Sequence, residues 1–184
     1  MNKLIMIVEI PKNSSNKYEY NVINNNWELD RVLSGSMHYS EEYGFIPKTL
    51  DYDGDPLDVI CLTNYPTFPG CHLPIKIIGV LKMIDGGEED DKLLAVNAVE
   101  PRLSNLNSLE DINKNKLDEI SNFFSRYKEL EHKKVEIKGF QHHEEAQKVL
   151  KNCQALYIKY KNLIKQGIDK KELVALINKD KVKK

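Results

Sequence analysis

One short stretch of the chain carries four carboxylates, Asp51, Asp53, Asp55 and Asp58, with no cation among them. Like charges that pack together raise one another's pKa and destabilise a fold unless a cation neutralises them. The stretch leads directly into the apolar run 59–62, which a solvated acidic loop rarely does. Hard carboxylate oxygens in this arrangement fit Mg²⁺ or Mn²⁺, with room left for water and for substrate phosphates.

A calcium-binding EF-hand loop is the main rival for this stretch. Asp51, Asp53 and Asp55 would occupy loop positions one, three and five. The match then fails, because Pro56 stands where the turn needs glycine and Leu62 where the loop needs a bidentate glutamate.

A second acidic stretch runs from Asp85 through Gly86 and Gly87 to Asp90, and Lys92 follows closely. The glycines let the backbone turn, so Asp85 and Asp90 could face one point from opposite sides of a loop. A solvated turn between two strands explains this stretch about as well. Together with the first stretch, it suggests more than one metal ion.

Chemistry on phosphate also needs cations directed at the substrate. Lys17, Arg31 and Lys128 are candidates, each beside acidic or aromatic residues. A lysine next to a glutamate is by default a surface pair worth at most about 1 kcal/mol. Arg31 is the more suggestive residue, because a guanidinium binds phosphate through two parallel hydrogen bonds.

The elements that must position these residues change in character near residue 100. Before it, β-branched runs alternate with Gly, Pro and Asp turns, which predicts short strands at 4–10, 18–22, 27–32, 56–62, 73–84 and 92–99. The asparagines at 24–26 predict a hairpin loop. This pattern favours a closed antiparallel β-barrel.

After residue 100 the apolar spacing becomes helical at Leu117, Ile120, Phe124, Tyr127 and Leu130. A last strand is predicted at 135–140 and a long helix at 146–163. Asp169 and Glu172 predict a capping box that starts a third helix over 169–181. The expected class is α+β, a barrel with flanking helices.

Length and composition exclude several other classes. A chain of 184 residues fits one domain, and its formal charge of -1 gives no footprint for wrapping nucleic acid. The three cysteines, Cys61, Cys71 and Cys153, form no disulfide or zinc pattern. The apolar runs are too short for a membrane helix or a signal peptide, so we expect a cytoplasmic protein.

Several segments resemble, in order, the signatures of the soluble family I inorganic pyrophosphatases of the bacterial type. The resemblance covers residues 4–160 and centres on Asp-Gly-Asp-Pro-Leu-Asp-Val at 53–59. It includes the segments 8–11, 17–19, 30–31, 43–47, 79–85, 90–92 and 123–128. One departure is Ser40 after Tyr39, where the family usually has proline, and this substitution could loosen the loop that presents Tyr43.

The resemblance implies a five-stranded closed β-barrel of the oligonucleotide-binding (OB) type with flanking α-helices, spanning residues 1–166, and a C-terminal helical extension at 167–184. It implies hydrolysis of pyrophosphate to two orthophosphates by attack of a metal-bridged water. Several Mg²⁺ ions per site are implied, with Mn²⁺ or Zn²⁺ as substitutes, and a homohexamer as the assembly.

The resemblance also assigns roles to individual residues. The expected metal ligands are Asp53, Asp58, Asp85 and Asp90. The expected catalytic proton acceptor is Asp55. The expected phosphate-binding residues are Lys17, Arg31, Tyr43, Tyr127 and Lys128. Supporting roles fall to Glu9, Glu19 and Lys92.

The charges are consistent with this chemistry, since pyrophosphate is a polyanion that a bare acidic site would repel and Mg²⁺ would attract. Two alternatives stay open. One is an OB-type nucleic-acid or phosphate-binding module without catalysis, because barrels of this type often bind single strands. The other is a phosphohydrolase that acts on nucleotides.

Overall fold

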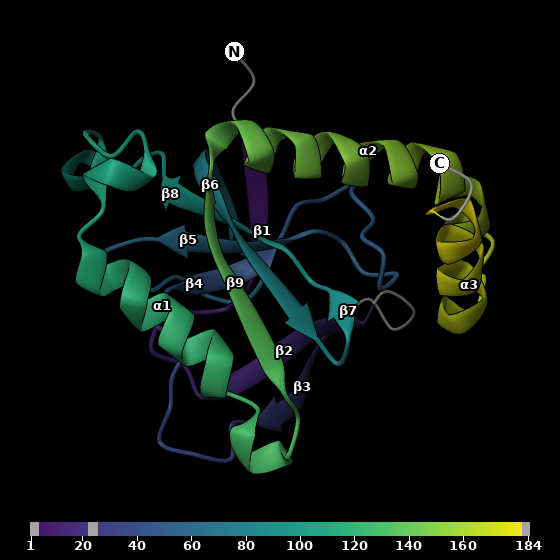
Figure 1. The fold of residues 1–184 in the computed structure, drawn as a ribbon, viewed down its shortest axis with the longest axis horizontal. Helices are drawn as coiled ribbons and strands as arrows, with labels where there is room; N and C mark the ends of the chain where they lie inside the picture. The colour runs from purple at the N-terminus through teal and green to yellow at the C-terminus, as the bar shows by residue number, and fades with distance from the viewer. Residues whose placement is uncertain (1–3, 22–25, 182–184) are drawn as a thin grey trace.

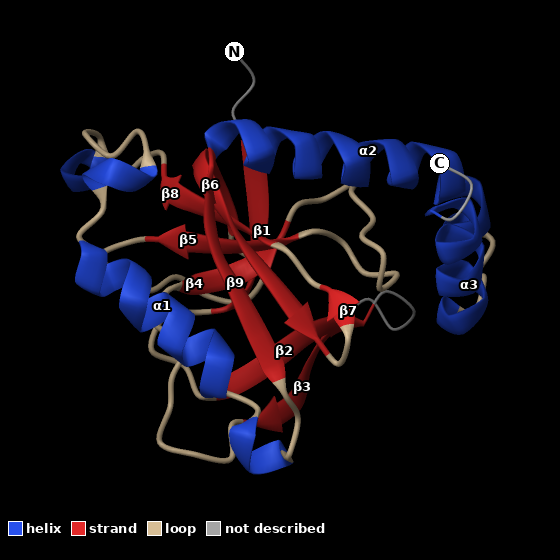
Figure 2. Ribbon diagram, viewed as in Figure 1, coloured by secondary structure: helices blue, strands red, loops and turns tan. Residues whose placement is uncertain are grey.

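The computed structural model describes residues 4–21 and 26–181, which form an α+β fold (Figures 1 and 2). One seven-stranded mixed sheet contains β1 (Leu4–Ile10), β4 (Glu42–Phe45), β5 (Asp58–Leu62), β6 (His72–Asp85), β7 (Glu88–Glu89), β8 (Lys92–Asn97) and β9 (Val135–His142). A separate pair contains β2 (Asn16–Asn21) and β3 (Asn26–Val32). The α-helices are α1 (Lys114–Arg126), α2 (His143–Lys165) and α3 (Lys170–Lys181), and single 3₁₀ turns lie at Pro101–Leu103, Leu109–Asp111 and Glu129–Glu131.

The main sheet pairs its strands in the order β1-β4-β5-β8-β6-β7. In addition, β9 pairs with β6, and β6 pairs with β1 at the start of the order. The expectation of a wholly antiparallel arrangement is wrong, because β5 and β8 run parallel. The chain between them passes through the long strand β6, which supplies the crossover that parallel neighbours require.

The predicted hairpin at the start of the chain is confirmed, but it lies outside the main sheet. β2 and β3 pair antiparallel, with Lys17 opposite Arg31 and Tyr20 opposite Trp27. Residues 22–25, and with them most of the predicted loop, lie outside the described residues. The hairpin therefore projects two candidate cations from one small ribbon.

Strand β4 was not predicted, and Gly44 is the reason that it can pair where it does. A Cβ atom at this position would lie 2.0 Å from the carbonyl oxygen of Ile7 on β1. Only glycine lets the two backbones come this close. The close approach fixes the neighbouring Tyr43 against the core.

Helix α1 lies against β9 at one side of the sheet (Figure 1). Its N-cap is Asn113, and Phe123 and Phe124 on its inner face are buried. The predicted apolar stripe extends past the end of the helix: α1 ends at Arg126, and Leu130, the last predicted position, is 63% exposed.

Helix α2 crosses the end of the sheet and packs against β6 (Figure 1). Helix α3 packs against the C-terminal part of α2 and runs across its direction (Figure 1). The predicted start of α3 is confirmed: Asp169 Oδ1 accepts hydrogen bonds from the backbone N–H groups of Lys171 and Glu172. The three cysteines are free thiols. In the part of the chain that the structure describes, none of the helices has the length and apolarity to cross a membrane.

Candidate active site

The centre of the site is a buried lysine between two carboxylates. Asp58 begins β5 and Lys92 begins β8, and these parallel neighbours place both residues at one end of the sheet. Lys92 Nζ lies 2.7 Å from Asp58 Oδ2 and 2.8 Å from Asp90 Oδ1. The side chain of Lys92 is only 2% exposed, so the cation holds both acids at one point inside the protein.

Negative charge is crowded at this point. Burial, with the charges of Asp55 and Asp58, raises the pKa of Asp53 from 3.8 to about 6. Burial also raises the pKa of Asp90, although Lys92 opposes the shift. Burial disfavours the charged form of Lys92, but the two carboxylates hold its pKa well above the usual range. An additional cation would relieve this crowding.

The second acidic stretch approaches the same region. Asp85 ends β6, and the backbone N–H of Asp90 returns to the carbonyl of Met83 over 3.1 Å. The charge of Asp85 contributes to the raised pKa of Asp90. That the two carboxylates face one point stays a prediction. Lys128 Nζ, from the segment after α1, forms an ion pair with Asp85.

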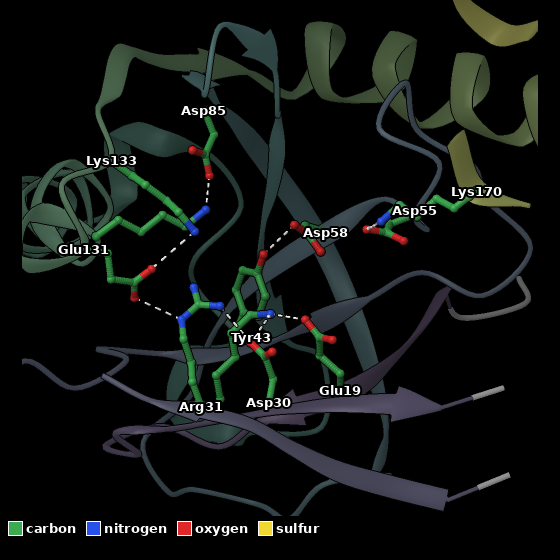
Figure 3. Close-up of polar contacts among 12 residues, drawn as sticks. Glu19, Asp30, Arg31, Tyr43, Asp55, Asp58, Asp85, Glu131, Lys133 and Lys170 are labelled. Atoms are coloured by element: carbon green, nitrogen blue, oxygen red, sulfur yellow. Dashed lines mark hydrogen bonds and ion pairs between the residues drawn. The ribbon is translucent and has the colours of Figure 1, made fainter. Parts of the chain in front are cut away.

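Two more cations come from the β2–β3 hairpin. Lys17 Nζ lies 3.2 Å from Asp30 Oδ2, and Arg31 Nη1 lies 2.7 Å from the same oxygen. Arg31 Nε also donates to Glu131 over 3.0 Å (Figure 3). Lys17 in turn contacts Glu19. Partial burial would raise the pKa of Asp30, but the charges of Lys17 and Arg31 lower it. The cations are thus held in place by acids at the site's edge.

Tyr43 connects the acidic centre to the aromatic core. Its hydroxyl donates a hydrogen bond to Asp58 (Figure 3). Burial raises the pKa of Tyr43, so the phenol keeps the proton that it donates. Its ring lies 5.3 Å from the ring of Tyr39, which packs in turn on Phe123 and Tyr127.

The segment before Tyr43 is held without the family's usual proline. The Tyr39 N–H donates to the carbonyl of Ser14 over 2.9 Å, and its carbonyl accepts from Asn13 over 2.8 Å. These backbone bonds lie directly before Ser40, at the place where the sequence predicted a looser loop.

Asp55 acts on the pKa of Asp53 but has a cation partner of its own. Its carboxylate pairs with Lys170 at the start of α3, and Figure 3 shows the pair to one side of Tyr43 and Asp58. Glu9 on β1 interacts with the centre through its charge: burial, together with the charge of Asp58, raises its pKa from 4.5 to about 8.

Asp51 lies on the side of this group that faces α2. It lines a cavity of about 130 Å³ beside α2, together with Asp91 and Cys153. Burial raises the pKa of Asp51 from 3.8 to about 7, and the charges of Asp53, Asp58 and Asp90 still act to raise it as well. The four acids of the first stretch therefore face different surroundings, although they are close in sequence.

The donor set fits a hard divalent cation. Asp53, Asp58 and Asp90 influence one another electrostatically, and carboxylate oxygens are the ligands that Mg²⁺ prefers. Within residues 4–21 and 26–181, no three Asp, Glu, His or Cys side chains already converge on one ion position. Asp58 and Asp90 are instead paired with Lys92. A bound cation would neutralise part of the negative charge that Lys92 neutralises now.

Sequence reasoning did not identify several residues that contact the site. Asp30 and Glu131 hold Arg31, and Tyr39 packs against Tyr43. The adjacent Asp30 and Arg31 carried a signal, since paired charges on a strand suggest a fixed geometry. Nothing in the sequence around Lys170 indicated its contact with Asp55, because the two residues come together only when α2 and α3 pack.

An α+β fold with a buried acidic centre, framed by Lys, Arg and Tyr side chains, defines a site for cation-assisted chemistry on a phosphate compound. The family model described as inorganic pyrophosphatase matches residues 6–158. An inorganic pyrophosphatase of Halalkalibacterium halodurans is 51% identical over 150 residues, which cover 82% of this chain and 92% of that protein.

Two further relatives extend this result. An inorganic pyrophosphatase of Malacoplasma penetrans is 43% identical over 178 residues, covering 97% of this chain and 96% of that protein. The solved structure of an inorganic pyrophosphatase from Helicobacter pylori has a TM-score of 0.82 at 38% identity, covering 84% of this chain and 93% of that chain. The chain belongs to the inorganic pyrophosphatase family.

Proposed function

We propose that this protein hydrolyses pyrophosphate to two orthophosphates in a magnesium-dependent reaction. The observation that carries the proposal is the contact of Lys92 with both Asp58 and Asp90, which gathers two carboxylates at one buried point. The named relatives support the reaction.

Asp53, Asp58 and Asp90 would hold the first Mg²⁺ ion, with Asp58 shared with a second. Asp85 and Asp90 would take ions that arrive with the substrate. When bound, magnesium would make the attacking water more acidic and neutralise charge on the phosphates. Substitution by Mn²⁺ or Zn²⁺ remains a prediction, since both bind carboxylate oxygens.

The remaining residues bind substrate and move the proton. Lys17, Arg31 and Lys128 would contact phosphate oxygens, and the hydroxyls of Tyr43 and Tyr127 would donate to them. In the structure these cations pair with Asp30, Glu131 and Asp85. On phosphate binding, each of these cations would exchange its carboxylate partner for a phosphate oxygen. Both partners accept charge-assisted hydrogen bonds from Lys and Arg.

Asp55 would accept the proton of the attacking water as general base. Glu19 would act through water, and Glu9 and Lys92 would keep the charge balance around Asp58. The raised pKa of Glu9, to which the charge of Asp58 contributes, is consistent with this role in the charge balance.

The finer description of the fold and assembly belongs to the same proposal. Strands β1, β4, β5, β8 and β6 pair in a closed order, which supports a five-stranded OB-type barrel. We assign residues 1–166 to the pyrophosphatase domain and 167–184 to a helical extension. A homohexamer and a cytoplasmic location are further predictions.

A substrate comparison tests the proposal against its alternatives. Pyrophosphate, a nucleoside triphosphate and a single-stranded oligonucleotide are each offered to the protein with magnesium. We expect phosphate release from pyrophosphate and no retention of the oligonucleotide. Release mainly from the triphosphate would favour a nucleotide phosphohydrolase, and retention of the oligonucleotide without release would favour a binding module.

A further inference from the structure

Helix α3 packs beside the first acidic stretch of the site. Leu173 and Ile177 on its inner face are buried against Tyr160 of α2 and against Leu50, which directly precedes that stretch. The backbone N–H of Leu50 donates to the carbonyl of Cys153 on α2 over 3.0 Å. Apolar contacts and one backbone bond thus fix α2, α3 and the start of the acidic stretch to one another.

The first residues of α3 lie directly against the tip of that stretch. A Cβ atom at Gly54 would lie 3.0 Å from Val174 Cγ2 and 3.3 Å from Lys170 Cγ. Gly54 has φ +87°, a left-handed conformation that favours glycine. The helix therefore meets the turn at a point where both the backbone conformation and the neighbouring side chains favour glycine.

Three hydrogen bonds within the turn connect Asp51, Asp53, Gly54 and Asp55. The Asp51 N–H donates to the Asp55 carbonyl over 2.7 Å, and the Gly54 N–H donates to the Asp51 carbonyl over 3.1 Å. The Asp55 N–H donates to Asp53 Oδ1 over 2.9 Å. A contact that holds Asp55 consequently also holds the backbone around Asp53.

Lys170 makes that contact from α3, since its Nζ pairs with Asp55 (Figure 3). The side chains of Lys170 and Asp55 are 57% and 54% exposed, and an exposed pair contributes at most about 1 kcal/mol to stability. The burial of Leu173 and Ile177 accounts for the attachment of the helix. The ion pair instead fixes the position of the Asp55 carboxylate beside Lys170.

We propose that Lys170 is a positioning residue of the active site, holding Asp55 and the turn at 51–55 in place for proton transfer. The inference rests on the proposed function, because it takes Asp55 as the general base. The family model ends at residue 158, so Lys170 lies beyond the region that the model matches. A small displacement of a reacting group can cost about 100-fold in rate, so a weak pair can still matter for turnover.

The test compares three variants of the full chain. Lys170→Met removes the cation, Lys170→Arg keeps it, and Lys171→Met is the matched control, because Lys171 is an exposed neighbour on the same helix. We expect Lys170→Met to lower kcat about 10-fold, with KM for pyrophosphate within twofold. Lys170→Arg should recover most of the rate, and Lys171→Met should match the wild type. An unchanged kcat in Lys170→Met would overturn the proposal, as would an equal loss in Lys171→Met.

A second readout does not depend on turnover. Amide hydrogen exchange in the peptide that contains the turn at 51–55 should be several-fold faster in Lys170→Met than in the wild type and in Lys171→Met, and slow again in Lys170→Arg. Unchanged exchange would overturn the positioning role. If the wild type releases no phosphate, the proposed function fails, and the exchange measurement still decides whether Lys170 holds the turn.

A double variant identifies the residue through which Lys170 acts. Asp55→Asn already removes the base, so adding Lys170→Met should lower kcat no further. Independent, multiplying losses would contradict the inference, because Lys170 would then act on another group.

Discussion

Lys92 donates a hydrogen bond to Asp58 over 2.7 Å, and the pair joins the first residues of two parallel strands. Asp90 accepts a second hydrogen bond from the same ammonium group over 2.8 Å. Without a divalent cation, this buried lysine is the partner that keeps the two acids together. The stability of this end of the sheet therefore depends on how the charges of Asp58 and Asp90 are neutralised.

Replacing Lys92 should destabilise the protein most when magnesium is absent. Removing one partner of a buried ion pair costs about 3–5 kcal/mol, because the other charge stays buried and unpaired. In Lys92→Met, added Mg²⁺ should recover part of the loss by neutralising Asp58 and Asp90. Urea unfolding in a chelator and in Mg²⁺ measures both free energies.

Lys148→Met is the control for this experiment, because Lys148 forms an exposed pair with Glu145 on α2. It should change stability by less than about 1 kcal/mol in either condition. The same large loss of Lys92→Met with and without Mg²⁺ would show that no cation replaces the lysine's charge.

Asp55→Asn should retain magnesium binding and lose most turnover. General-base catalysis contributes about 10²–10⁴-fold to a rate, and the amide cannot accept the proton. Steady-state kinetics gives kcat, and calorimetric titration with Mg²⁺ gives the metal affinity. Glu144→Gln, at an exposed position on α2, serves as the charge-matched control. Activity near that of the wild type would remove Asp55 from the role of base.

Glu9 should make stability depend on pH when no magnesium is bound. Burial, with the charge of Asp58, raises its pKa from 4.5 to about 8. A raised carboxyl pKa contributes stability that is fully present below pH 4.5 and is lost as the pH rises through about 8. The stability of Glu9→Gln relative to the wild type should therefore increase across this interval, because glutamine does not ionise.

Urea unfolding midpoints of the two proteins in a chelator test this prediction. A difference between them that is constant from pH 4.5 to about 8 would mean that folding does not raise the pKa of Glu9.

Gly44→Ala should be strongly destabilising, since the new methyl would lie 2.0 Å from the carbonyl oxygen of Ile7. Overpacking a core costs about 1–3 kcal/mol, and a clash with backbone is at or above the upper end. Gly35→Ala is the control, because its nearest neighbour would be a side-chain atom of Leu130 at 3.5 Å. Thermal unfolding compares the two, and equal melting temperatures would contradict the close approach of β1 and β4.

The sequence predicted the strands and helices with strong local patterns. The apolar periods identified β1, β6 and α2, and the Asp169 cap identified the start of α3. The four-residue strand β4 was missed, because its pattern is too short and its position depends on contact with β1. The parallel pairing of β5 and β8 is likewise a property of the crossover rather than of either strand.

The acidic centre could be predicted more fully than the contacts around it. Close spacing predicted the two acidic stretches, and the charges of Asp53, Asp58 and Asp90 do act on one another in the fold. Their role as metal ligands was implied by the family resemblance and stays a prediction. The partners Glu131 and Lys170 lie far along the chain from Arg31 and Asp55. Local spacing contains no information about such pairs, because they form only after the helices pack.

Release of phosphate from pyrophosphate, with Mg²⁺ and then with an excess of chelator, tests the central claim most directly. We predict rapid release with magnesium, none with the chelator, and recovery when magnesium is restored. Equal release in the chelator would contradict the metal-dependent site. No release with any divalent cation would contradict the proposed function itself.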